Sequence, residues 1–207
     1  MPRTFAPDTL PPEEALARLR EGNRRFVLGD GSALRRWHPG LTDQPSPFAV
    51  VLGCADSRAP AEYVFDQDLG DLFVIRVAGN IVAPSLVGSV EFAASEFGTR
   101  LVVVMGHTQC GAVAATMNAL TLGGGPASRN LRSIVDRIAP HVQPLLDASG
   151  ESDKGLGAAV RANAIASARE LRHASSALQD LVDQGRVAIV SAVYDLETGV
   201  VTFHDEP

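Results

Sequence analysis

Three short, unbroken apolar runs alternate with helical patterns in the first half of the chain. The runs cover residues 48–53, 72–77 and 101–106, and their length and composition are typical of strands buried on both faces. Amphipathic stretches at about 61–66 and 84–97 separate them and predict helices. This order predicts a βαβαβ unit, in which the strands are parallel and joined by right-handed crossovers.

Helical patterns precede and follow this unit. Prolines and acidic residues ahead of regularly spaced apolar positions predict an N-terminal helical arm at about 11–27. Beyond a glycine-rich break, residues 128–147 and 157–184 are mostly helical in pattern. We expect Pro140 and Pro144 to interrupt the first of these two stretches.

The chain ends in a hairpin pattern. Residues 187–194 predict a strand, and residues 200–204 predict a short partner at the edge of the sheet. We therefore expect one α/β domain over residues 1–207, with a mainly parallel central sheet of about four strands, a C-terminal edge strand and flanking helices.

Composition narrows the choice of partners. The 207 residues are 45% hydrophobic and carry 18 basic against 24 acidic side chains, a net charge of −6. This balance gives no attraction to nucleic acid or to an anionic membrane surface. No apolar run approaches the roughly 20 residues that cross a bilayer, and the first residues lack the apolar core of a secretion signal. We therefore expect a cytoplasmic protein without a nucleic-acid or membrane partner.

The chain has two cysteines, and both follow predicted strands. Cys54 comes directly after the first strand, whereas His107 and Cys110 follow the third. Parallel strands end on one rim of a sheet, so two thiolates and one imidazole can converge there. This set of ligands suits Zn²⁺ better than Mg²⁺ or Ca²⁺, and three protein ligands leave a tetrahedral ion one open position. Buried thiols or a disulfide would give His107 no role.

Asp56 lies two residues after Cys54, and Arg58 lies two residues further on. Asp56 can become the fourth metal ligand, which would cap the site. Alternatively, the planar guanidinium of Arg58 can hold the carboxylate through two charge-assisted hydrogen bonds, leaving it beside the metal as an acceptor. Without the cysteines, the same pair would be equally well explained as a structural ion pair.

These residues resemble the two motifs of the β-class carbonic anhydrases, Cys-x-Asp-x-Arg and His-x-x-Cys. The resemblance spans about residues 44–205 and includes Phe73-Val74-Ile75-Arg76, Ala78-Gly79-Asn80 and Val193-Tyr194-Asp195. It implies a lyase that reversibly hydrates CO₂ to bicarbonate and a proton, by attack of zinc-bound hydroxide. One Zn²⁺ per chain would be held by Cys54, His107 and Cys110, and Asp56 with Arg58 would orient the hydroxide.

The resemblance also implies substrate and subunit contacts. Phe73 and Ala78 match apolar pocket positions, and Gln44 is the candidate for a glutamine that contacts the substrate. Phe92 matches an aromatic that reaches the pocket from a neighbouring subunit, which implies a homodimer or a dimer of dimers. On residue type alone, Phe73 and Phe92 would be core residues.

Two other functions remain open at this stage. A related zinc hydrolase could act on CS₂ or COS, whose carbon is similarly electrophilic. A non-catalytic zinc-binding module would instead hold a permanent Cys-Asp-His-Cys site. In addition, Val51 stands where some bacterial members have the tryptophan of a second bicarbonate pocket, although Arg76 and Tyr194 match its other positions.

Overall fold

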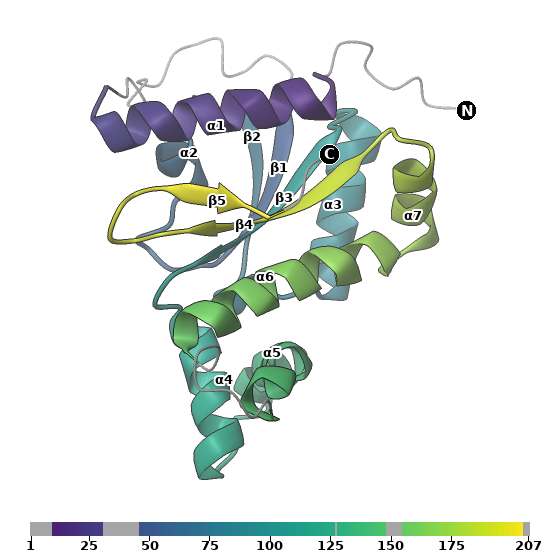
Figure 1. Cartoon of the computed structure of the whole chain (residues 1–207). Helices are drawn as coiled ribbons and strands as arrows, with labels where there is room; N and C mark the ends of the chain where they lie inside the picture. Colours follow the sequence, from purple (N-terminus) through teal and green to yellow (C-terminus); the bar gives the residue numbers. More distant parts are fainter. Residues whose placement is uncertain (1–9, 31–45, 127, 148–154, 205–207) are drawn as a thin grey trace.

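A five-stranded sheet forms the centre of the molecule (Figure 1). The computed structural model describes residues 10–30, 46–126, 128–147 and 155–204. In the sheet order β2-β1-β3-β4-β5, the first four strands are parallel and β5 is antiparallel to β4. The strands are β1 (Ala49–Gly53), β2 (Leu72–Arg76), β3 (Leu101–His107), β4 (Ala188–Tyr194) and β5 (Val201–Phe203). The expected mainly parallel sheet with a C-terminal edge strand is confirmed.

Helices cover both faces of this sheet. In Figure 1, α1 crosses one face and α3, α6 and α7 lie on the other, while α4 and α5 pack together at one end. The helical elements are α1 (Pro12–Leu28), α2 (Ala61–Val64), the 3₁₀ turn η2 (Ala78–Asn80), α3 (Pro84–Glu96), α4 (Gly111–Leu122), α5 (Arg129–Asp147), α6 (Leu156–His173) and α7 (Ser176–Asp183). The chain thus folds into three layers, helix on sheet on helix.

One expectation about the helices was wrong. Pro140 and Pro144 lie inside the single helix α5, because Ile138 and Val142 are fully buried and their packing offsets the lost backbone hydrogen bonds. The stretch 157–184 is mostly helical, as expected, and consists of α6 and α7. Ser175 lies between α6 and α7, and its side chain accepts a hydrogen bond from the Leu178 N–H at 3.1 Å, which caps the start of α7.

The unbroken apolar runs are explained by burial on both sides of the sheet. Val51 of β1 packs with Leu16 and Leu19 of α1, whereas Leu52 and Val104 pack on the opposite face against α3 and α6. All five side chains are at most 2% exposed. Burying one such side chain contributes about 1.5–3 kcal/mol, so the layers on the two faces fix the position of each strand end.

Helix α1 is anchored to the sheet by one buried amide. The Asn23 Nδ2 donates to the carbonyls of Val64 and Gly199 at 3.0 and 2.9 Å, and its Oδ1 accepts from the Val201 N–H at 2.9 Å. These three bonds join α1 to α2 and to the β4–β5 hairpin. The N-terminal helix therefore lies on the sheet of its own chain.

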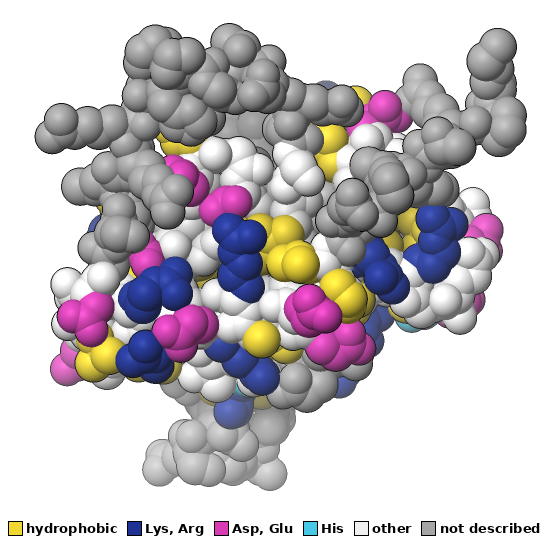
Figure 2. All heavy atoms as spheres, turned by 90° about the horizontal axis from the view of Figure 1, so that it is seen from above, with side chains coloured by type: hydrophobic (Ala, Val, Ile, Leu, Met, Phe, Trp, Pro, Cys, Tyr) yellow, Lys and Arg dark blue, Asp and Glu magenta, His cyan; other side chains and the backbone are white. Residues whose placement is uncertain are grey.

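Three arginines of α1 form ion pairs with acidic side chains. Figure 2 shows basic and acidic groups interspersed on the face that carries this helix. The ion pairs are Arg18–Asp71 at 2.7 Å, Arg24–Glu21 at 2.8 Å and Arg25–Asp66 at 2.5 Å. Among the described ranges, no helix is long and apolar enough to cross a membrane.

Candidate metal centre

Three ligand atoms meet at the carboxyl-terminal rim of the sheet. Cys54 directly follows β1, His107 ends β3, and Cys110 immediately precedes α4. The side-chain ligand atoms of these residues lie within 4.8 Å of one another, and the residues are 6%, 1% and 1% exposed. The structure therefore brings together the three residues that the sequence analysis assigned to zinc, because β1 and β3 are adjacent and parallel.

The geometry of the cluster fits a metal ion. The two Sγ atoms are 4.0 Å apart, close to the roughly 3.8 Å that two Zn–S bonds of about 2.3 Å subtend in a tetrahedron. A disulfide would require about 2.05 Å. His107 Nδ1 donates to the Thr108 carbonyl at 2.9 Å, while Nε2 is buried without a hydrogen-bond partner. This pattern leaves the lone pair of Nε2 for a metal.

Electrostatics also prepare the cluster for a cation. The neighbouring Cys110 thiol, the His107 side chain and the Gly79 N–H, which lies 3.3 Å from Cys54 Sγ, lower the pKa of Cys54 to about 4 against the opposing effect of burial. Metal ligation requires the deprotonated sulfur, so a lowered pKa at Cys54 makes this ligand available near neutral pH.

Arg58 holds the Asp56 carboxylate beside the cluster. Its Nε and Nη2 donate to Oδ1 and Oδ2 at 2.9 and 2.8 Å, and its backbone N–H donates to Oδ1 at 2.9 Å. These bonds hold the pKa of Asp56 well below its usual range. Asp56 Oδ2 lies 3.9 Å from His107 Nε2. Of the two arrangements open to Asp56, the structure thus has the pair with Arg58.

Comparison with known proteins identifies the family. A family model described as carbonic anhydrase matches residues 49–201. Carbonic anhydrase 2 of Mycobacterium tuberculosis is 39% identical over 206 residues, which cover 94% of this chain and 93% of that protein. The β-carbonic anhydrase CcaA superposes with a TM-score of 0.69 at 24% identity, covering 93% of this chain and 88% of that one. The chain belongs to the β-carbonic anhydrase family.

A second solved structure supports the same fold. A structure from a study of two tetrameric β-carbonic anhydrases of Sordaria macrospora superposes on this chain with a TM-score of 0.68 at 19% identity. The match covers 92% of this chain and 97% of that one. The β-carbonic anhydrases use zinc, and the Cys54–His107–Cys110 cluster is the group in the described residues that fits this ion.

The expected substrate-binding residues of this β-carbonic anhydrase are not all near the metal cluster. Ala78 lies in η2, next to the residue whose N–H contacts Cys54. Phe73 pairs with Val50 in the sheet, four residues before Cys54, so it lies roughly 13 Å along the strands from the cluster. The rings of Phe73 and Phe92 are 6.2 Å apart, and Phe92 is 50% exposed. Gln44 lies outside the described residues.

Two supporting residues were not identified as such from the sequence. Arg76 Nε donates to the Cys54 carbonyl at 3.0 Å, and its Nη2 donates to the Asp56 carbonyl. Arg76 was assigned only as a match to a second bicarbonate pocket, yet here it braces the metal-binding loop. Gly79 was quoted only as part of a shared motif. Its φ of +72° would have been the signal, but a glycine in sequence does not reveal its conformation.

The other two positions matched to a second bicarbonate pocket are part of the core or pack against it. Val51 is fully buried beneath α1, and Tyr194 packs edge-on against Phe26 with ring centroids 6.4 Å apart. Burial raises the pKa of Tyr194, and the nearby Asp195 adds to this effect. A tryptophan at position 51 would not fit this core without displacing α1.

Proposed function

We propose that this chain hydrates CO₂ reversibly, with Cys54, His107 and Cys110 holding one Zn²⁺. The observation that carries the proposal is the convergence of these three ligand atoms within 4.8 Å, while Asp56 is held outside the set by Arg58. When bound, Zn²⁺ would supply a Lewis acid that makes hydroxide available near neutral pH. Overall, the OH of water adds to the carbon of CO₂ and one proton passes to solvent.

Asp56 is proposed to orient the reacting oxygen. Its ionised carboxylate can only accept hydrogen bonds, so a proton-bearing oxygen beside it must direct its hydrogen towards Oδ2 and a lone pair towards the substrate carbon. Arg58 fixes the plane of the carboxylate by its forked geometry. Together, Asp56 and Arg58 select one orientation among those that solvent would allow.

The non-catalytic alternative is disfavoured by the same contacts. A permanent Cys-Asp-His-Cys site requires Asp56 as a fourth ligand, and the carboxylate would then have to give up its hydrogen bonds from Arg58. For CS₂ or COS, no contact in the described residues favours either over CO₂. We propose CO₂ as the substrate, and an assay of sulfide release from CS₂ on the same sample separates the two.

We further propose a homodimer or a dimer of dimers. Phe92 is 50% exposed and packs with Phe73 and Phe97 in one aromatic cluster, which is distant from the metal cluster of its own chain. The tetrameric Sordaria macrospora proteins have the same fold. Because Phe92 is half exposed and distant from the metal cluster of its own chain, we propose that it contacts the metal site of a second copy.

A cytoplasmic location is part of the proposal. Cys54 and Cys110 are free thiols with sulfurs 4.0 Å apart, and metal binding requires both to stay reduced. The reducing cytoplasm favours that state, whereas an oxidising compartment favours disulfides.

The test combines a rate with a metal measurement. Stopped-flow CO₂ hydration across pH, with zinc content determined on the same sample, should give activity proportional to zinc. Removing the metal with a chelator should abolish the rate, and adding Zn²⁺ should restore it. Cys110→Ser should lower both quantities, whereas Ser167→Ala, a change at a buried position of α6, should lower neither. Full activity in metal-free protein would refute the proposal.

A further inference from the structure

A chain of buried polar contacts leads from α5 and α6 to the metal loop. Asn163 of α6 is completely buried, and its Nδ2 donates to the Gly79 carbonyl at 2.9 Å. Its Oδ1 lies 3.0 Å from His141 Nδ1 on α5. The same Gly79 donates its N–H to Cys54 Sγ at 3.3 Å. Asn163 is thus one residue removed from a metal-binding sulfur, although it is distant in sequence.

The direction of each hydrogen bond in this chain is determined. The Gly79 carbonyl can only accept, so the Asn163 amide must turn its NH₂ group towards it. The amide oxygen then faces His141, and Nδ1 of that ring must carry the hydrogen. His141 Nε2 is 3.7 Å from Glu170 Oε2. Reversing the Asn163 amide would set two oxygens against each other.

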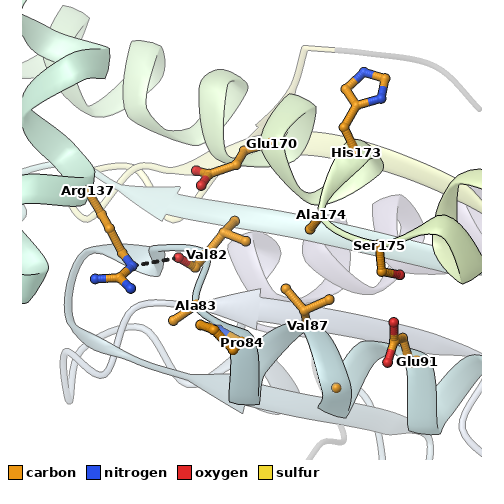
Figure 3. Close-up of a pocket in the computed structure, with 11 residues that line it drawn as sticks. Val82, Ala83, Pro84, Val87, Glu91, Arg137, Glu170, His173, Ala174 and Ser175 are labelled. Carbon is orange, nitrogen blue, oxygen red and sulfur yellow. Dashed lines mark hydrogen bonds between the residues drawn. The ribbon is translucent and has the colours of Figure 1, made fainter.

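The outer end of the chain reaches solvent at a cavity of about 600 Å³. Figure 3 shows Glu170 and Arg137 approaching this cavity from α6 and α5, with Arg137 Nε donating to the Val82 carbonyl at 3.0 Å. The Glu170 side chain is 46% exposed, whereas that of His141 is 14% exposed and Asn163 is sealed. The buried end of the chain, at Asn163, is therefore the part that solvent cannot replace.

Gly79 is held tightly by its surroundings. Its φ of +72° is a left-handed conformation, and a Cβ at this position would lie 2.6 Å from Ile138 Cδ1 of α5. Only the φ and ψ rotations of Gly79 separate its N–H from its carbonyl. Fixing the carbonyl therefore restricts where the N–H points, and that N–H points at Cys54 Sγ.

We propose that Asn163, oriented by His141, is a positioning residue that keeps the Gly79 N–H on the Cys54 sulfur. The inference rests on the proposed zinc centre and goes beyond its three ligands. An N–H···S hydrogen bond draws charge from a thiolate, so the sulfur passes less charge to a metal and the ion keeps more of its Lewis acidity. Asn163 thereby tunes the metal site without touching it.

The test uses an isosteric variant and a matched control on the same helix. Asn163→Leu keeps the branched shape and the number of heavy atoms but removes the donor to Gly79. Ser167→Ala changes another fully buried residue of α6 whose Oγ has no hydrogen-bond partner. In competition with a chelator, we expect the zinc dissociation constant of Asn163→Leu to rise about tenfold, because the Cys54 sulfur would no longer be held in place and this loss of positioning outweighs the stronger donation of a more electron-rich sulfur. The dissociation constant of Ser167→Ala should stay unchanged.

A spectroscopic measurement separates positioning from general loosening. In Co²⁺-substituted protein, a weaker N–H···S bond leaves the sulfur richer in electrons, so the sulfur-to-cobalt charge-transfer band of Asn163→Leu should move to longer wavelength. Ser167→Ala should keep the wild-type band. An unshifted band in Asn163→Leu would overturn the inference, whatever its zinc dissociation constant, because a raised dissociation constant alone indicates general loosening.

His141 provides a second pair of variants if Asn163→Leu does not fold. His141→Leu removes the donor to Asn163, whereas His141→Asn keeps a donor near the position of Nδ1. The band should shift in His141→Leu and recover in His141→Asn, and equal bands in the two variants would overturn the inference. A wild-type protein without any sulfur-to-cobalt band would instead refute the zinc centre itself.

Discussion

At the scale of single residues, the Asp56 carboxylate combines two properties that matter for catalysis. It accepts three hydrogen bonds from Arg58, and it still lies 3.9 Å from the free Nε2 of His107. The first property keeps it ionised and fixed in plane. The second places it next to the ligand atoms without joining them, so its contribution should appear in the rate more than in metal binding.

The Asp56→Asn variant tests this separation. The amide keeps the shape but loses the charge and one acceptor, so we expect kcat/KM to fall about 10- to 100-fold while zinc content stays near the wild-type level. Glu21→Gln is the matched control, because Glu21 has the same forked contact with Arg24, at 2.9 and 2.8 Å, on the exposed face of α1. Loss of zinc with a normal rate per bound metal would contradict the assigned role.

Gly79→Ala tests the strained turn at the metal loop. The left-handed backbone and the 2.6 Å approach to Ile138 Cδ1 should together cost about 2–4 kcal/mol in the free energy of unfolding. Gly157→Ala in α6 is the control, since nothing lies within 4 Å of a Cβ there, and as a helical position it should gain up to about 1 kcal/mol rather than lose stability. Urea unfolding of the zinc-loaded proteins measures both, and equal stabilities would show that the turn can relax.

At the scale of elements, the apolar pattern predicted the strands well because both faces of the sheet are covered. The rim position of Cys54 and His107 followed directly, since adjacent parallel strands end together. Contacts between distant segments had no such local pattern. Asn163 lies among small residues on the buried side of α6, and nothing nearby in the sequence connects it with Gly79, 84 positions earlier. Likewise, the continuity of α5 through Pro140 depends on tertiary packing.

Asn23 tests how firmly α1 is attached. Asn23→Ala removes three hydrogen bonds and leaves buried partners on α2 and the β4–β5 hairpin unpaired, so we expect a loss of about 2–4 kcal/mol in the free energy of unfolding. Arg24→Ala, the next residue on the same helix, breaks only an exposed ion pair and should cost less than about 0.5 kcal/mol. Urea unfolding at one fixed protein concentration compares them. Equal costs would mean that Asn23 does not anchor the helix.

At the scale of the whole molecule, one chain contains the metal cluster but not a complete set of the expected substrate contacts. Phe73 and Phe92 lie in an aromatic cluster with Phe97 on the side of α3, away from Cys54. Residue type alone favoured core positions for both phenylalanines, and this is true only in part, because Phe92 is half exposed. In the proposed assembly a second copy would cover this ring, and no pattern within one chain can specify such a contact.

Phe92→Asp therefore tests the proposed assembly. A carboxylate at the centre of an apolar contact would be buried without a partner, so the dimer dissociation constant should rise at least about tenfold. Leu131→Asp is the control, because Leu131 on α5 is 52% exposed, close to the 50% of Phe92, and should leave assembly unchanged. Sedimentation velocity over a range of concentrations measures the equilibrium between monomer and dimer.

Zinc content should stay normal in both variants, since all three ligands lie within one chain. The rate of CO₂ hydration should fall in Phe92→Asp alone, and only at concentrations where its dimer dissociates. Wild-type sedimentation of Phe92→Asp at every concentration would exclude this face as the interface.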